Sequence, residues 1–183
     1  EASAIQNAGC FLTEGTADAV KLEVDGKWIP RVEAICNAGI AVVAHLGSRP
    51  QQAKQTGGYT TAGRSADAAK IIVEDAVAME QAGVSMLLLE AVPEEVSIAV
   101  VEATHVPVIG CGAGTACHGQ VVVMQDLAGM TAWQPSFAKP TARIGEEITA
   151  VASTWMQNVS TNNLGKHPYN MHDGESELFK ERG

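Results

Sequence analysis

Hydrophobic and polar residues follow two distinct patterns along the chain. Across residues 66–82, apolar side chains recur every three or four positions with charged ones between them, which is the spacing of a helix with one covered face. The runs 40–44 and 86–89 are instead continuously apolar, as expected of parallel strands buried on both faces. The pattern therefore predicts helices that alternate with parallel strands.

Helix and strand meet at a recurring joint that contains a glycine. Three helical stretches end in this way, and each leads within a few residues into an apolar run. The stretches are 1–13, 32–38 and 66–82, and their glycines are Gly15, Gly39 and Gly83. Each glycine is predicted to adopt the left-handed conformation that ends a helix.

The same alternation continues along the chain. Pro93 is predicted to begin a helix that runs to about Ala103, because proline suits the first helical turn. Residues 106–109 are predicted to form the next strand, and residues 119–124 a further one. Apolar density falls after Gln157, where no periodic face remains.

Short joints between alternating elements indicate an α/β fold, either an open wound sheet or part of a β/α barrel. A complete eight-unit barrel usually needs about 200 to 250 residues, whereas this chain has 183. We expect residues 1–140 to form β/α units. Residues 141–183 are expected to form a C-terminal helix and a polar tail that is mobile or packs on a neighbouring subunit.

Charge and composition narrow the classes of partner. The chain carries 21 acidic and 12 basic residues, for a net charge of -9, which argues against a nucleic-acid partner. No apolar run reaches the roughly 18 residues of a membrane span, so no membrane association is expected. The four cysteines show no paired close spacing, which argues against a disulfide framework and favours the cytoplasm.

Candidate chemistry lies at the predicted strand ends. Ligands of parallel α/β sheets bind where strands end at their carboxyl side, because the loops that leave this edge converge there. The groups at these ends are Lys21, Glu23, His45 and Glu90, followed by the glycines Gly110, Gly112 and Gly114.

Each of these polar residues also has a structural interpretation. Glu90 follows an apolar strand, so its carboxylate should be partly shielded from water and suit a general base, or else it caps the next helix. Lys21 requires an anionic partner, which is either a substrate or Glu23. His45 could donate a hydrogen bond to a carbonyl or enolate oxygen, or serve as a buried structural histidine.

Other motifs give weaker signals. The run 110–114 is glycine-rich, but an apolar strand-like segment follows it instead of the helix that a dinucleotide loop requires. Cys111, Cys117 and His118 lack a fourth metal ligand at a recognisable spacing. The glycine-rich loop that contains Tyr59 and Arg64 is either a lid over the site or an ordinary surface loop.

Six motifs, in order, resemble those of the ketopantoate hydroxymethyltransferase family. They are Val20-Lys21-Leu22-Glu23; Ala44-His45-Leu46-Gly47 with Pro50-Gln51; Gly57-Gly58-Tyr59 with Gly63-Arg64; Leu89-Glu90 with Val92-Pro93; Ile109-Gly110-Cys111-Gly112-Ala113-Gly114; and Gly119-Gln120. The resemblance implies a (β/α)8 TIM-type barrel, of which residues 1–140 supply roughly the later half.

The resemblance also implies an activity. The family transfers a hydroxymethyl group from 5,10-methylenetetrahydrofolate to 3-methyl-2-oxobutanoate, giving 2-dehydropantoate for pantothenate biosynthesis, through an enolate stabilised by Mg2+. Carried over by motif, Glu90 is the base, Lys21 and His45 contact the substrate, and Glu23 lies at or near the magnesium ion. The implied partners are the 2-oxo acid, the folate and further copies of the chain in a cytoplasmic homo-oligomer.

The chain also differs from the family's usual pattern. The two main magnesium-binding aspartates of the family lie in earlier strands and have no counterpart here, so we expect those strands to come from residues outside this sequence or from another chain. Two glycines of the family are replaced by Val24-Asp25-Gly26, a leucine and threonine by Ser48-Arg49, and an aspartate by His118. Two alternatives therefore stay open: a noncatalytic half-barrel homologue, and a related magnesium-dependent 2-oxo-acid enzyme with a different substrate.

Overall fold

The computed structural model describes residues 1–182, except for the side chains of residues 55 and 56. The chain divides into two compact units, residues 1–123 and the residues from 124 onward. In the described part of the chain, no helix is both long and apolar enough to cross a membrane.

The first unit contains a parallel sheet of five strands in the order β1-β2-β3-β4-β5. The strands are β1 (Val20–Glu23), β2 (Val42–Gly47), β3 (Met86–Glu90), β4 (Val108–Cys111) and β5 (Gly119–Gln120). The spatial order is the same as the order in the sequence. The reversal of strand order that marks a doubly wound sheet is not found among these strands.

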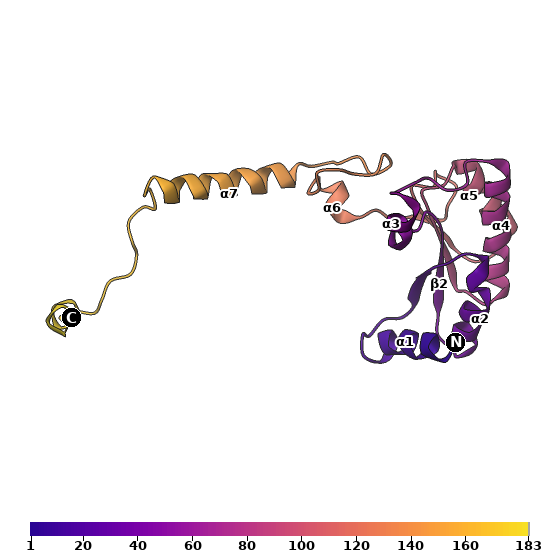
Figure 1. Ribbon diagram of the computed structural model, residues 1–183, viewed down its shortest axis with the longest axis horizontal. Coiled ribbons are helices and arrows are strands. Elements are labelled where there is room, and N and C mark those ends of the chain that lie inside the picture. The colour runs from indigo at the N-terminus through magenta and orange to yellow at the C-terminus, as the bar shows by residue number, and fades with distance from the viewer. Residues whose placement is uncertain (183) are drawn as a thin grey trace. The chain divides into compact units, whose positions relative to one another are not determined.

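Helices connect the strands and pack along one face of the sheet. The longer helices are α1 (Ala2–Thr13), α2 (Ile29–Asn37), α4 (Ala66–Gln81) and α5 (Glu94–Ala103), and the short ones are η1 (Gly26–Trp28), η2 (Pro50–Gln52) and α3 (Ala53–Thr56). Right-handed crossovers in a sequential sheet place successive helices on the same face. Accordingly, α2, α4 and α5 lie on one side of β2, and α4 contacts both α2 and α5 (Figure 1).

Burial follows this one-sided cover. On β3, Leu87 and Leu89 point toward the helices and are fully buried, whereas Met86 and Leu88 on the other face are only half-buried. On β2, His45 of the second face is nevertheless fully buried. The second face of β3 is thus less buried than the first, because α2, α4 and α5 cover only the first.

The glycine joints are confirmed at two of three places. Gly39 and Gly83 have positive φ angles of 84° and 94° and follow α2 and α4 as predicted. After α1 the left-handed residue is Thr16, with φ 54°, so the prediction for Gly15 is wrong. Gly15 has a different constraint, because a Cβ there would lie 2.6 Å from the carbonyl oxygen of Phe11.

Two predicted strands are displaced. β4 begins at Val108, two residues later than expected, and β5 ends at Gln120, after which a short helix begins at Met124. The amide of Val121 still donates to the carbonyl of Gly110. Beyond it the side chain of Val123 is half exposed. The valine run 121–123 is therefore apolar in sequence but does not form a buried strand.

The second unit consists of α6 (Met124–Leu127), α7 (Ile144–Ser160) and α8 (Glu175–Arg182) with loops between them. None of the residues in α7 is buried, although Ile148, Val151, Trp155 and Val159 share one side of it. The predicted boundary after residue 140 and the predicted role of the tail stay predictions.

Candidate active site

The register of the sheet brings the predicted site residues onto the face without helices. Glu23 of β1 is paired with His45 of β2 in the ladder, and Gly47 of β2 is paired with Glu90 of β3. Because side chains alternate between faces along a strand, Lys21, Glu23, His45 and Glu90 all project from this second face. Glu23 and Glu90 also end their strands, at the carboxyl edge where ligands of such sheets bind.

Lys21, His45 and Glu90 form a line across three neighbouring strands. The Nζ of Lys21 lies 3.2 Å from the Nδ1 of His45, and the Nε2 of His45 lies 3.2 Å from the Oε2 of Glu90. The side chain of His45 is fully buried, whereas that of Glu90 is 14% exposed. The histidine therefore lies between a cation and a carboxylate.

The lysine assigns the tautomer of His45. An ammonium group can only donate, so the Nδ1 that it contacts must accept and carries no proton. The proton of the neutral ring is then on Nε2, facing the Glu90 carboxylate. The direction of this N–H does not meet the geometry of a hydrogen bond, and Nε2 has no hydrogen-bond partner among the described residues. A small rotation of the Glu90 carboxylate would satisfy it.

These contacts decide between the interpretations left open by the sequence. No ion pair joins Lys21 to Glu23 among the described side chains, because Lys21 is directed to His45. Glu90 does not cap the next helix, since α5 begins after Pro93 without a side-chain cap. His45 has no exposed surface in this structure, and its predicted contact with the substrate stays a prediction.

Glu23 is held by the loop that follows β2. Its Oε2 accepts a hydrogen bond from the backbone amide of Gln51 at 3.1 Å. Among the described residues, no group of three histidine, cysteine or acidic side chains comes close enough to hold a metal ion. Glu23 is the one metal ligand that the sequence analysis predicts, and its place near a magnesium ion stays a prediction.

The sequence analysis missed an ion pair beside Glu23. Arg49 donates from Nη1 to Oδ2 of Asp25, and the other oxygen of Asp25 accepts from the amide of Lys27 at 3.1 Å. Partial burial raises the pKa of Asp25, but the Arg49 hydrogen bond, the Lys27 amide and the charges of both residues outweigh it and leave the pKa below its usual value. The two residues lie 24 positions apart, and neither belongs to a recognisable motif.

The glycine-rich turn after β4 is shaped by packing. A Cβ at Gly110 would lie 2.7 Å from the side-chain oxygen of Gln120, and one at Gly114 would lie 2.5 Å from the Cγ of Glu94. Glu94 accepts two hydrogen bonds of 2.7 Å, from the amide and the hydroxyl of Thr115, and these bonds lower its pKa. The turn is thereby attached to the start of α5.

His118 lies at the other end of the sheet. Its Nδ1 accepts a hydrogen bond of 3.1 Å from the amide of Val108, the first residue of β4. In a parallel sheet this amino edge is opposite the one where Glu23 and Glu90 lie, so His118 has a structural position and does not select a substrate.

The glycine-rich loop after β2 returns to the chain beside Glu90. The amide of Ala62 donates to the carbonyl of Ala91, and the amide of Ser48 donates to the carbonyl of Glu90. A hollow of about 170 Å3 is lined by Gly47, Ser48, Arg49, Gln52, Ala53, Gly58, Thr60 and Ala62. The loop is thus close to the carboxyl edge, and its predicted role as a lid stays a prediction.

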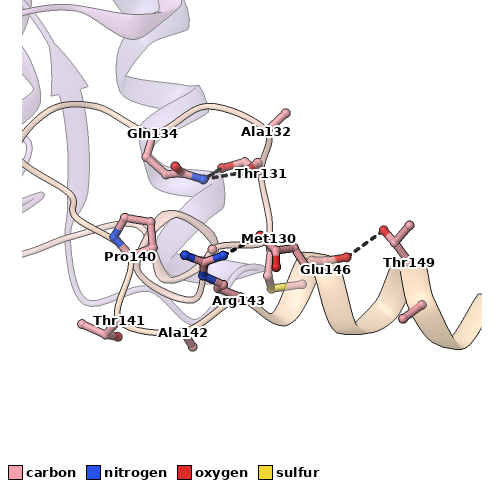
Figure 2. Close-up of a pocket in the computed structure, with 13 residues that line it drawn as sticks. Met130, Thr131, Ala132, Gln134, Pro140, Thr141, Ala142, Arg143, Glu146 and Thr149 are labelled. Carbon is pink, nitrogen blue, oxygen red and sulfur yellow. Dashed lines mark hydrogen bonds and ion pairs between the residues drawn. The ribbon is translucent and has the colours of Figure 1, made fainter.

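Larger hollows do not contain the Lys21, His45 and Glu90 line. One of about 500 Å3 lies among α1, β1 and α2, and Lys21 and Glu23 are at its border. Another, of about 980 Å3, lies within the second unit, between the loops around Thr131 and Thr141 and the beginning of α7 (Figure 2). Its charged residues, Arg143 and Glu146, form an exposed ion pair and give no sign of catalytic use.

Comparison with known proteins points to one family. The profile of a family described as ketopantoate hydroxymethyltransferase matches residues 1–167. Three curated relatives bear the name 3-methyl-2-oxobutanoate hydroxymethyltransferase. The protein from Syntrophobacter fumaroxidans is 43% identical over 85% of this chain and 56% of its own length. The proteins from Clostridium beijerinckii and Moorella thermoacetica are 36% and 43% identical, over 97% and 92% of this chain and 65% and 62% of their own lengths.

The alignments cover most of this chain but only part of each relative. Nearly the whole of this chain aligns with these relatives, but it spans only about three-fifths of their length. The profile covers every strand of the sheet together with Lys21, Glu23, His45 and Glu90. The chain therefore belongs to the ketopantoate hydroxymethyltransferase family.

Proposed function

We propose that this chain forms part of an enzyme that transfers a hydroxymethyl group from 5,10-methylenetetrahydrofolate to 3-methyl-2-oxobutanoate and so makes 2-dehydropantoate. Family membership supports the reaction type, and the relatives' names supply the acceptor. The observation that carries the proposal for this chain is the Lys21, His45 and Glu90 line on the uncovered face of the sheet. It joins a cation suited to a carboxylate substrate to a shielded carboxylate suited to a general base.

In the proposed reaction Glu90 removes the proton from C3 of the keto acid. The resulting enolate carbon forms a bond to the methylene carbon of the folate, and both carbon–nitrogen bonds that hold this carbon break. Water supplies the hydroxyl oxygen, and the C3 proton and one proton of the water pass to the two folate nitrogens. Lys21 uses one N–H toward His45 and keeps two for the carboxylate of the keto acid. His45 is buried between Lys21 and Glu90, with its Nε2 3.2 Å from the Oε2 of Glu90, and keeps the two side chains in place by packing.

This chain is proposed to supply only one of the ligands of the magnesium ion. When bound, it would polarise the carbonyl group of the keto acid and make the C3 proton more acidic. Glu23 is available as one ligand, and we infer that the others lie outside these 183 residues. The steps assigned to Glu90, Lys21 and His45 do not depend on how that site is built.

We also infer that further strands complete the sheet into a barrel. Five strands follow one another in a single direction with their helices on one face, as in the wall of a β/α barrel. The terminal strands β1 and β5 leave edges, and the half-buried apolar groups of the second face are suited to a barrel interior. Intact and native mass measurements would test this, together with the expected homo-oligomer. The cytoplasmic location stays a prediction.

Replacement of the base tests the reaction directly. Glu90→Gln keeps the size of the side chain and removes its basicity, so exchange of the C3 hydrogen of 3-methyl-2-oxobutanoate with D2O should fall by about 10²-fold or more. Proton NMR of the keto acid measures this exchange, and calorimetric titration should show keto-acid affinity within about threefold of the parent protein. As a matched control, Glu74→Gln changes an exposed carboxylate of α4 and should leave exchange unchanged. Exchange by the parent protein that is undiminished in Glu90→Gln would exclude Glu90 as the base. A parent protein with no exchange above that of buffer would favour the noncatalytic alternative.

A further inference from the structure

We propose that Arg49 is a positioning residue, which joins the loops after β1 and β2 and thereby holds Glu23 at the carboxyl edge of the sheet. The proposal deepens the proposed function and rests on it for the role of Glu23. The four residues concerned, Glu23, Asp25, Arg49 and Gln51, are called the loop clamp below.

The loop clamp consists of two bonds between the same two segments. Arg49 forms an ion pair with Asp25, and two residues later the amide of Gln51 donates to the carboxylate of Glu23. On one side the partners are Glu23, the last residue of β1, and Asp25 just after it, and on the other side both partners follow β2. Glu23 and Asp25 are themselves two residues apart, so the two bonds are parallel connections between one pair of loops.

The ion pair has the features of a contact that contributes energy. The side chains of Arg49 and Asp25 are 26% and 28% exposed, in contrast to 74% and 64% for the surface pair of Lys70 and Glu74. Exposed pairs contribute little, because water and salt screen them. Asp25 also caps the η1 turn, because its carboxylate accepts a hydrogen bond from the amide of Lys27. This bond fixes the direction of the carboxylate that Arg49 contacts.

A third contact attaches the β1 loop to the helical layer. A Cβ added to Gly26 would lie 2.7 Å from Oδ1 of Asp75 on α4, so the loop backbone approaches this carboxylate closely. Burial raises the pKa of Asp75, and the charge of Asp25 raises it further, while the Gly26 amide and the charge of Arg49 lower it. Arg49 is paired with Asp25, and its charge also acts on Asp75.

The carboxylates around Arg49 argue against a role for this arginine in binding an anionic substrate. Ser48 and Arg49 border the 170 Å3 hollow beside β2, where a free guanidinium would attract an anionic group. With Asp25 bound to it and Asp75 nearby, the local charge is negative instead. Arg49 therefore serves the loop and does not bind a substrate anion.

The test uses Arg49→Gln, Asp25→Asn and the double variant in the assembled protein. Each single variant should increase the hydrogen-exchange rate of the Gln51 amide about tenfold, measured by mass spectrometry of the 48–53 segment. The double variant should exchange no faster than either single one, because both break the same bond. Lys70→Gln, which breaks the exposed Lys70 and Glu74 pair, is the matched control and should change nothing in this segment.

Turnover gives a second readout that separates positioning from stability. Each single variant should lower kcat by about tenfold with a smaller change in KM, since a displaced Glu23 harms the reaction geometry more than ground-state binding. Arg49→Lys, which keeps the charge, should recover part of the loss. Unchanged exchange at Gln51 in both single variants would overturn the clamp. Faster exchange in a protein whose parent form has no transferase activity would keep the clamp and overturn the proposed function instead.

Discussion

The Nε2 of His45 lies 3.2 Å from the Oε2 of Glu90, and the two side chains come from adjacent strands of the sheet. The other ring nitrogen faces the ammonium group of Lys21, which can only donate to it. A residue with no exposed surface thereby connects the group proposed to hold the substrate with the group proposed to take its proton.

Removal of the imidazole should therefore affect stability and chemistry together. His45→Ala deletes a fully buried side chain and leaves Lys21 and Glu90 without their shared neighbour, so unfolding should require about 2 kcal/mol less free energy. Urea denaturation measures this loss, and C3 hydrogen exchange of the keto acid should slow as well. His105→Ala is the control, because that side chain is 95% exposed and its loss should stay within about 0.5 kcal/mol. A stable variant with normal exchange would show that His45 neither orients Glu90 nor supports Lys21.

Two glycines with similar backbone angles should respond differently to alanine. Gly47 has φ 92° and would place a Cβ 2.5 Å from the carbonyl oxygen of Glu90, whereas Gly39 has φ 84° and open space around it. Gly39→Ala should cost only the left-handed strain, about 1 kcal/mol. Gly47→Ala adds a collision with the backbone of the proposed base, so it should cost at least about 2 kcal/mol and slow C3 exchange. Thermal unfolding and the NMR exchange assay compare the pair. Equal losses of unfolding free energy in both variants would mean that the close approach of Gly47 to Glu90 does not affect stability.

The carboxylate of Glu80 should make stability depend on pH. Its oxygen accepts hydrogen bonds of 2.6 and 3.0 Å from the amides of His105 and Val106, where the chain enters β4. The His105 amide is the main reason that the pKa of Glu80 lies below its usual 4.5. A carboxylate with a lowered folded pKa contributes stability above the unfolded value, and this contribution disappears as pH falls through the folded pKa.

Glu80→Gln should therefore destabilise the protein by about 1 kcal/mol at pH 7 and by much less at pH 3. Urea midpoints at the two pH values give the comparison. Glu102→Gln, on the neighbouring helix α5, provides a control without such amide contacts among the described hydrogen bonds. A Glu80→Gln effect of the same size at both pH values would show that the charge of Glu80 is not responsible.

Much of the fold follows from local patterns. The helix over 66–82, the glycines at 39 and 83 and the apolar strands all arise from residues close together in sequence, where side-chain spacing and backbone freedom act directly. The failures also have local causes. Thr16 takes the left-handed turn in place of Gly15, whose role is a close approach to Phe11, and a pattern of residue types does not distinguish these two uses of glycine.

The sequence by itself determined that Lys21, Glu23, His45 and Glu90 belong to the strands of a parallel sheet, because helix and strand alternate along the chain. Glu23 and Glu90 end their strands as predicted, whereas Lys21 and His45 lie within theirs. Only the tertiary structure decided how they pair. Lys21 contacts His45 and not Glu23, and Arg49 meets Asp25 across 24 residues. Such pairings depend on strand register, on the path of two loops and on side-chain rotamers, and these are set by packing among segments that are distant in the sequence.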